Sequence, residues 1–337
     1  MTIIPVATID RKIWNQHEIY SEIALAMCKN KFFTLDFLDE GPDLRNLGII
    51  DFLEKASDEL NFPLKNITIC TANIFNTHPH IKIIYKAPFH LLQFAKDYID
   101  EVPKAKVIKK FGIFIGRSNA LRLSLASYIY SNYQNQSLIN YHFNIHDDFH
   151  SANIGLEEIM RQRSINDVKQ EAELLKNCPL KTNIDVQTII IDKSLSINPA
   201  QQLFLQDKSL FTQLYKNFLV EIVCESYFTG QTFFPTEKTW RPILLKTPFM
   251  VQGPVNFLKN LKSLGFKTFN DYWDESYDED PSWVAVQTIK NNLDTLSKLN
   301  DLEIYEMYLS MKDILEHNYK LALTITSKDF HKINDQK

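Results

Sequence analysis

The sequence predicts an α/β fold made of two successive units of parallel sheet. Short apolar runs alternate with amphipathic segments, which is the pattern of repeated βαβ units. At 337 residues, the chain has the length of two domains rather than one. The stretch Val220–Gly253 shows the pattern most clearly, since an apolar run, a loop, a helix and a second short apolar run follow one another there. We therefore expect the fold to be organised around this central stretch.

The first unit, residues 1–103, alternates strand and helix signals. Its expected strands are rich in β-branched and aromatic residues, and its expected helices carry apolar residues at helical spacing. The strands are Ile3–Ile9, Phe32–Phe37, Asn66–Ala72 and His80–Tyr85, and the helices are His17–Lys29, Leu47–Leu60 and Phe89–Ile99. Together they predict a small α/β domain.

The second unit begins after Pro103 and spans residues 104–300, and a helical segment with a polar tail follows at 301–337. Its expected strands are Ala105–Gly116, Leu138–Phe143, Val186–Ile191 and the two of the central stretch. Its expected helices are 120–133, one or two within 157–176, Phe204–Lys216, one from about Thr236, Val255–Leu264, Ser282–Leu299 and Asp301–Leu323. This order predicts a second, Rossmann-like domain.

Composition excludes several classes of protein. With 45% hydrophobic and 23% charged residues the chain is typical of a soluble globular protein, and it contains neither an apolar run long enough for a membrane span nor a signal-peptide pattern. We therefore expect a cytoplasmic protein. A net charge of −4 does not indicate general electrostatic binding of the whole protein to nucleic acid. The 4 cysteines form no CxxC pair, and neither the dinucleotide nor the P-loop glycine pattern occurs.

The helix of the central stretch begins with an unusual set of charges. Thr236 is a good N-cap and Glu237 suits the positive end of the helix dipole. Lys238 and Arg241 oppose that dipole, by roughly 0.3–1 kcal/mol for a charge in the first turn. A bound phosphate reverses the sign of this effect, because the free backbone N–H groups and the ammonium then converge on one anion. The alternative is a solvated lysine on a surface helix.

Carboxylates near the strand end suggest what else is bound. Glu225 and Glu237 are placed where carboxylates accept hydrogen bonds from ribose or sugar hydroxyls in parallel-sheet proteins, and Ser226 lies beside them. A phosphate, a ribose and a sugar together make a nucleotide sugar. The sequence therefore predicts a nucleoside-diphosphate sugar as donor, with no further cofactor.

The stretch CES…FFPTEKTWRPILLKTPFMVQGP resembles the donor-site signature of the α-1,3/4-fucosyltransferases. In that family a strand ending in Glu-Asn-Ser precedes a Thr-Glu-Lys that opens a helix. Here Glu225-Ser226 lacks the middle Asn and the loop to Thr236 is longer. The TEKT…RPI…PF pattern, with the later GFKTF and DESYD segments, is also similar to uncharacterised glycosyltransferase-like proteins of bacteria and phages. The resemblance is specific in this part of the chain and faint elsewhere.

The resemblance implies a GT-B fold, in which two Rossmann-like domains face each other across a cleft and the second binds the nucleotide sugar. It implies a metal-independent transfer to a hydroxyl acceptor such as a glycan, with inversion at the anomeric carbon. GDP-fucose, a GDP-linked sugar, is one candidate donor. The first domain is then expected to bind the acceptor.

The start of the second unit has the same pattern as the central stretch, a strand followed by a capped helix start with cations beside it. A strand ends at Gly116, Ser118 or Asn119 is able to cap the next helix, and Arg117 and Arg122 lie close to its start. The fucosyltransferases have a similar Ser-Asn followed by Arg, and this implies that Arg122 grips the donor diphosphate, where its fork of donors suits two phosphate oxygens. The alternative is a surface arginine on an amphipathic helix.

An inverting transfer also needs a base for the acceptor hydroxyl, from the first domain. Glu40 follows the second strand in a Gly-Pro turn, with Asp36 and Asp39 as competitors. At the end of the third strand, Thr71 and Asn73 either bind acceptor hydroxyls or terminate the strand with an Asx turn.

Metal binding is not expected. His78, His80, His142, His146 and His150 have no compact ligand spacing, although His142 or His146 after a strand is placed to face the cleft. The acidic run 274–280 resembles manganese-binding acid pairs but follows no clear strand, so we expect a loop near the donor. The aromatic residues at 227–228 and 233–234 either cover the donor or pack in the core.

Two other functions stay open at this stage. The first is a phage-type glycosyltransferase acting on DNA bases, which needs a basic cleft such as Lys104, Lys106, Lys109 and Lys110 would supply. The second is a non-catalytic protein that uses the same cleft to bind a nucleotide or sugar.

Overall fold

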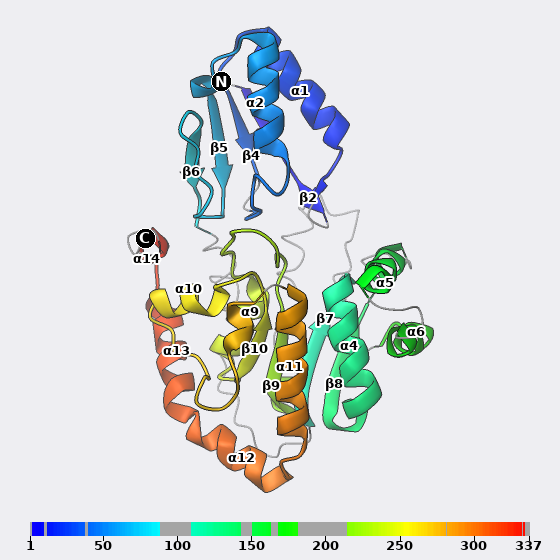
Figure 1. The fold of residues 1–337 in the computed structure, drawn as a ribbon. Helices are drawn as coiled ribbons and strands as arrows, with labels where there is room; N and C mark the ends of the chain where they lie inside the picture. Colours follow the sequence, from blue (N-terminus) through cyan, green and yellow to red (C-terminus); the bar gives the residue numbers. More distant parts are fainter. Residues whose placement is uncertain are drawn as a thin grey trace, which may run out of the picture.

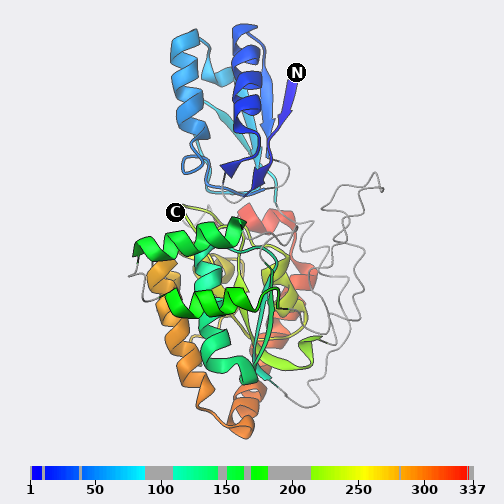
Figure 2. The ribbon, with the colours of Figure 1, turned by 90° about the vertical axis from the view of Figure 1, so that its right-hand side faces the viewer.

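A computed structural model describes residues 2–9, 12–37, 40–87, 109–142, 150–162, 168–180, 214–280, 282–331 and 333. These residues form two four-stranded parallel sheets, each covered by helices, together with a two-stranded antiparallel hairpin. The two sheets lie in two bodies, the first above the second in both views of the ribbon (Figures 1 and 2). The predicted α/β class is therefore confirmed.

The first sheet winds in one direction, with strand order β1-β4-β5-β6. Its strands are β1 (Thr2–Pro5), β4 (Phe33–Asp36), β5 (Ile67–Thr71) and β6 (Lys82–Tyr85). Helices α1 (Gln16–Cys28) and α2 (Ile49–Leu60) join the first three strands and pack against each other, with Tyr20 stacked on Phe52. Successive right-handed crossovers that move the same way along a sheet place their helices on the same face, as seen here.

The second sheet has a different strand order, β10-β9-β7-β8. Its strands are β7 (Lys109–Ile115), β8 (Ser137–Tyr141), β9 (Phe218–Cys224) and β10 (Phe249–Gln252). Helix α4 (Ala120–Tyr133) leads from β7 outward to β8, while α9 (Glu237–Leu244) leads from β9 outward to β10 on the other side. The two connections therefore diverge between β7 and β9, which makes this point a topological switch point.

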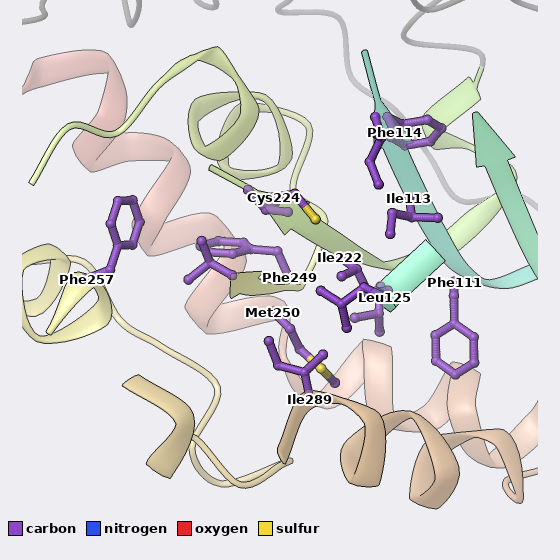
Figure 3. Close-up of a cluster of buried hydrophobic side chains, with 14 of the residues drawn as sticks. Phe111, Ile113, Phe114, Leu125, Ile222, Cys224, Phe249, Met250, Phe257 and Ile289 are labelled. Atoms are coloured by element: carbon purple, nitrogen blue, oxygen red, sulfur yellow. The ribbon is translucent and has the colours of Figure 1, made fainter. Parts of the chain in front are cut away.

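The core of the second body is built around β9, all of whose residues are buried. Ile222 of β9 and Met250 of β10 lie together with Leu125 of α4 and Ile289 of α11 (Ser282–Ser297) (Figure 3). Burial on both faces is expected for the central strand of a parallel sheet, and it explains why β9 is apolar at every position except Glu221.

The remaining helices surround this second core. They are α5 (His150–Gln162), α6 (Lys169–Lys176), α10 (Phe257–Ser263), α12 (Asp301–Ser310), α13 (Lys312–Thr324) and α14 (Ser327–Phe330), with short 3₁₀ turns at Leu64–Asn66, Gln134–Gln136 and Ser276–Asp278. Phe330 of α14 packs against Trp240 of α9 and Phe233. The C-terminal segment, residues 301–333, thus belongs to the same hydrophobic core as the second sheet.

Two element predictions were wrong in detail. The expected strand Ile3–Ile9 is divided into β1 and β2 (Thr8–Ile9), and β2 pairs with β3 (Lys12–Ile13) in a separate hairpin. Pro5 cannot donate a backbone hydrogen bond, and β1 ends there. The expected helix Asp301–Leu323 is broken at Met311, and the break lets both parts turn buried side chains toward one core.

Other predictions lie outside the described residues: the helix Phe89–Ile99, the boundary near Pro103, the strand Val186–Ile191 and most of the helix Phe204–Lys216. No helix in the described part of the chain is long and apolar enough to cross a membrane.

Candidate functional site

The predicted donor residues gather at the carboxyl edge of the second sheet, at the switch point. Strand β7 ends at Ile115, just before the segment 117–119, and β9 ends at Cys224, just before Glu225. The N-termini of α4 and α9 follow these strand ends after a turn and a loop. Ligands of open parallel sheets bind in the crevice outside such a switch point.

The start of α4 is capped by Asn119. Its side-chain Oδ1 accepts a hydrogen bond from the backbone N–H of Arg122 at 3.0 Å. Ser118, the alternative cap, instead makes a hydrogen bond between its hydroxyl and the hydroxyl of Tyr141 on β8. The sequence therefore placed the helix start correctly, and the structure chooses between the two caps.

Arg122 joins the two strand ends across the switch point. Its Nη1 donates to the carbonyl oxygen of Arg117 at 2.9 Å, and its Nη2 donates to the carbonyl oxygens of Glu225 at 2.7 Å and Cys224 at 3.2 Å. The side chain is buried, with 7% of the residue exposed. A guanidinium held against these carbonyls puts a permanent positive charge at the floor of the crevice. Its contact with a diphosphate stays a prediction.

Glu225 fixes the beginning of α9. Its carboxylate accepts hydrogen bonds from the Thr236 N–H at 3.0 Å, the Thr236 hydroxyl at 2.7 Å, the Thr239 hydroxyl at 2.5 Å and the Ser226 N–H at 3.1 Å. The residue is 1% exposed. The sequence predicted a contact with ribose or sugar, which no observation here tests; the structure gives Glu225 the role of positioning the helix that carries Lys238. Thr239 was missed, although it lies one turn after Thr236 on the same helix face.

The first turn of α9 concentrates charge at the crevice. Thr236 caps the helix, and its hydroxyl oxygen accepts from the Lys238 N–H at 3.3 Å. The Lys238 ammonium lies 2.9 Å from Glu237 Oε1, 3.2 Å from Ser226 Oγ and 3.3 Å from Thr236 Oγ1. Burial disfavours the charge of Glu237, but Lys238, Arg241 and a backbone hydrogen bond together outweigh it and lower the pKa of Glu237 to about 2. The Lys238 and Glu237 side chains remain 22% and 28% exposed, so both can meet a ligand.

Arg241 does not join this cluster. Its Nε donates to the Tyr215 hydroxyl at 3.0 Å, and its Nη2 lies 3.6 Å from Glu221 Oε1. The Tyr215 hydroxyl in turn donates to Glu221 Oε2. Burial opposes the charge of Arg241, but Tyr215, Glu221 and Glu237 together raise its pKa. The prediction missed the rotation of the helix, which turns Arg241 toward the buried middle of β9 rather than the strand ends.

Glu40 comes to the site from the first body. Its Oε2 accepts a hydrogen bond of 2.7 Å from the Tyr227 hydroxyl, which belongs to the loop between β9 and α9. Burial raises the pKa of Glu40, while the nearby charges of Lys238 and Arg117 lower it and that of Glu237 raises it. The structure thus brings Glu40 within electrostatic range of three residues that the sequence predicted at the donor site.

The competing carboxylates differ in their surroundings. Asp36 makes an ion pair with Lys86, whose Nζ lies 3.0 and 2.9 Å from the two carboxylate oxygens. Asp39 lies outside the described residues. Among the described candidates, Glu40 is therefore the one next to the donor cluster.

Asn73 helps to build the contact between the two bodies, and Thr71 supports it from within the first body. Asn73 Oδ1 accepts from the Phe75 N–H at 3.2 Å, which is the Asx turn considered as the alternative. Its Nδ2 donates to the carbonyl oxygens of Pro42 at 3.2 Å and Gln231 at 2.9 Å. Both residues are almost fully buried, and Thr71 Oγ1 accepts from the Asn73 N–H at 3.2 Å. The structure supports the strand-terminator alternative; binding of an acceptor stays untested.

The loop between β9 and α9 is docked on the first body. The Thr232 hydroxyl donates to the Gly41 carbonyl oxygen at 2.5 Å, and the Gln231 N–H donates to Asp43 Oδ2 at 2.8 Å. Phe234 lies so close to Gly41 that an added Cβ there would be 2.6 Å from its ring. Of the two alternatives for the aromatic residues of this loop, the structure shows core packing, since Tyr227, Phe228, Phe233 and Phe234 are all buried.

The remaining polar motifs have structural partners. His78 Nε2 bonds Glu54 at 3.0 Å, and Asp278 Oδ1 and Oδ2 accept from the Leu258 and Lys259 N–H groups at the start of α10. Within the described residues no group of three or more histidines, cysteines and carboxylates is arranged to hold a metal. His142 is buried after β8, and His146 and the side chain of His150 lie outside the described residues.

The expected basic groove for DNA is only partly covered by the described residues. Lys110 Nζ donates to the carbonyl oxygens of Ser297 and Leu299 near the end of α11, and Lys109 Nζ donates to that of Asn135. Lys104 and Lys106 lie outside the described residues. Both described lysines therefore have backbone partners in the fold, and the DNA alternative stays untested.

Comparison of the chain with family models, curated proteins and solved structures gave no match.

Proposed function

We propose that this protein is a glycosyltransferase that transfers a sugar from a nucleoside-diphosphate sugar to a hydroxyl group. The observation that carries the proposal is the meeting of two kinds of residue at one place. Cations and helix N-termini lie at the switch point of the second sheet, and the Glu40 carboxylate faces them from the first body. This is the pairing of leaving-group stabiliser and base that glycosyl transfer needs.

The donor end of the proposal rests on the charge at the crevice. Helices α4 and α9 both begin there, and their free N–H groups favour an anion. Lys238 is partly exposed beside them and Arg122 supplies a fixed charge below. We expect the diphosphate to lie over these N-termini, with Glu237 accepting hydrogen bonds from ribose or sugar hydroxyls. Arg117 and Ser226 lie at the rim of the same crevice.

The acceptor end rests on Glu40. As the acceptor oxygen forms its bond to the anomeric carbon, its proton passes to Glu40, and the bond from that carbon to the diphosphate oxygen breaks with its electron pair leaving on the diphosphate. Lys238 and Arg122 stabilise the charge that develops there. Attack from the face opposite the leaving group inverts the configuration. The raised pKa of Glu40 suits a base of this kind.

Thermal-shift measurements with GDP, UDP, CMP, ADP and dTDP test the donor site. We expect one nucleoside diphosphate to raise the melting temperature of the wild type and to lose this effect in Lys238→Ala. Lys298→Ala, which removes an exposed lysine at the end of α11, is the matched control and keeps the shift. No shift with any nucleotide at millimolar concentration contradicts the proposal.

Turnover separates the enzyme from a binding protein of the same fold. The nucleotide identified by the thermal shift is offered as its sugar conjugates, and release of the nucleoside diphosphate is followed with and without glycan acceptors. Release that depends on Glu40 supports the enzyme. Tight binding without release or transfer supports the non-catalytic alternative. Transfer to DNA alone supports the DNA-modifying alternative.

A further inference from the structure

A short chain of hydroxyl groups ends on the Glu40 carboxylate. The Thr8 hydroxyl oxygen lies 2.8 Å from the Tyr227 hydroxyl oxygen, and the Tyr227 hydroxyl lies 2.7 Å from Glu40 Oε2. Thr8 belongs to the small hairpin β2–β3, Glu40 follows β4, and Tyr227 follows β9. Three segments from distant parts of the sequence therefore converge on one carboxylate oxygen.

The direction of these hydrogen bonds is fixed by the carboxylate. An ionised carboxylate only accepts, so the Tyr227 hydroxyl uses its single proton toward Glu40. Its oxygen is then the acceptor for the Thr8 hydroxyl. Within the described residues no other side chain donates to the Glu40 carboxylate, so its second oxygen, Oε1, takes no part in the chain.

Tyr227 is held rigidly enough to orient its partner. The residue is only 8% exposed, and its ring packs edge-on against Phe234 with the ring centroids 5.8 Å apart and against Ala72 of the first body. The ring therefore occupies a packed position between the bodies, and the hydroxyl at its tip is directed by that packing.

We propose that Tyr227, oriented by Thr8, is the positioning residue for the base of the reaction proposed above. Its hydrogen bond holds Oε2, and Oε1 is left to accept the proton of the acceptor hydroxyl. The inference rests on the proposed function, because only a transfer reaction gives Glu40 a proton to accept. It goes further in giving Thr8 and the Tyr227 hydroxyl a role toward the base, which the sequence analysis did not give them.

The charged groups that face Glu40 set the direction of its titration. They are Lys238 and Glu237 of α9 and Arg117 of the turn after β7. Burial raises the pKa of Glu40, and the hydrogen bond from Tyr227 lowers it by stabilising the ionised form. Removal of the Tyr227 hydroxyl is therefore expected to raise the pKa of Glu40 further, so that a more alkaline solution is needed to ionise the base.

The position of Tyr227 also couples the base to the donor site. Tyr227 lies two residues after Glu225, and the same loop continues into Thr236 and Lys238. A displacement of this loop would move the base-positioning hydroxyl and the first turn of α9 together. The loop thus links the base to the first turn of α9.

The test is the variant Tyr227→Phe, which keeps the ring and removes only the hydroxyl. We expect the acidic limb of the pH profile of kcat/KM to move upward by about one pH unit, the scale of a hydrogen bond to a charged group. The KM for the donor is expected to stay within about twofold, since no donor contact is removed. Thr8→Val is expected to move the acidic limb of the kcat/KM profile upward by a smaller amount. It replaces Tyr227→Phe as the test if Tyr227→Phe folds poorly.

The matched control is Tyr20→Phe. Tyr20 lies on α1 and stacks on Phe52, and its hydroxyl makes no hydrogen bond with the described residues. Like Tyr227→Phe, this variant loses one tyrosine hydroxyl, but that hydroxyl makes no hydrogen bond to the proposed base. The pH profile of kcat/KM should therefore not change.

A second measurement separates failure of this inference from failure of the proposed function. The pKa of Glu40 is read from its carboxyl carbon by NMR, with the signal assigned by its loss in Glu40→Gln. A higher pKa in Tyr227→Phe together with a shifted pH profile supports the inference. Transfer with an unchanged pKa and an unchanged acidic limb overturns it. A higher pKa in a protein that transfers no sugar overturns the proposed function, and the role of Tyr227 in transfer with it.

Discussion

The two sheets use their carboxyl edges differently, although both are parallel and both have four strands. The first sheet winds in one direction and has no point at which its connections diverge. The second sheet diverges between β7 and β9, and the charged residues of the candidate site gather at that point. Two parallel sheets of equal size thus differ in where a binding site can form, and their strand order decides the difference.

The polar residues at the two edges show the same contrast. At the first edge, Thr71 and Asn73 give their hydrogen bonds to backbone groups and to the docked loop. At the second edge, Lys238 and Glu237 are partly exposed and face the crevice. The first edge therefore positions the second body and contributes Glu40, while the second edge carries the charge for the donor.

The largest expected effect separates the buried charge of the second body from its exposed charge. Arg241→Met removes the cation that faces Glu221, which is 1% exposed, and should destabilise the fold by about 3–5 kcal/mol in urea unfolding. Nucleotide binding, measured where the variant is folded, should be unchanged. The double variant Glu221→Gln/Arg241→Met should recover part of the stability. A folded Arg241→Met that no longer binds nucleotide would restore Arg241 to the donor site.

A smaller effect tests the docking of the loop on the first body. Gly41→Ala places a Cβ 2.6 Å from the ring of Phe234, so one of the two segments must move, at a cost of about 1–3 kcal/mol. We also expect transfer activity to fall, because Glu40, the proposed base, is the residue immediately before Gly41. Gly48→Ala is the comparison variant in the same unit. Its added Cβ meets no atom within 4 Å, so its strain comes from its φ of +78° rather than from a contact with another segment. Equal activity in Gly41→Ala and wild type contradicts the docking.

The smallest effect concerns the pH dependence of the ion pair at the crevice. The folded pKa of Glu237, about 2, lies below its ordinary value of 4.5. Its contribution to stability is therefore present above pH 4.5 and is lost as the pH falls toward 2. Because the pair is partly exposed, we expect less than about 1 kcal/mol. Comparing acid unfolding of wild type and Glu237→Gln measures it, and identical curves over that pH range rule it out.

Local sequence patterns predicted most of the described elements and the place of the site. Alternating apolar runs located β4, β5, β7, β8, β9 and β10, and the N-caps Asn119 and Thr236 located the starts of α4 and α9. In such folds the ligand-binding residues follow the ends of strands. The residues at the switch point could therefore be selected from the sequence, without knowledge of which residues contact them in space.

The roles of individual side chains could not be predicted in the same way. Whether Glu225 meets a ligand or caps a helix depends on how the loop of the central stretch returns to it, and that is a tertiary property. Arg241 was misplaced because the sequence does not show which face of α9 lies on β9. The contact between Thr8 and Tyr227 joins residues 219 positions apart, and no local pattern reports it.

The central claim is that the second sheet binds the donor and the first body supplies the base. It is tested most directly by calorimetric titration of the preferred nucleoside diphosphate into the wild type, Lys238→Ala and Glu40→Gln, with sugar transfer measured on the same samples. We predict that Lys238→Ala weakens nucleotide binding at least tenfold, the effect of about 1.4 kcal/mol. Glu40→Gln should bind like the wild type and lose transfer by about a hundredfold or more. Equal binding by all three proteins, or full transfer by Glu40→Gln, would contradict the account.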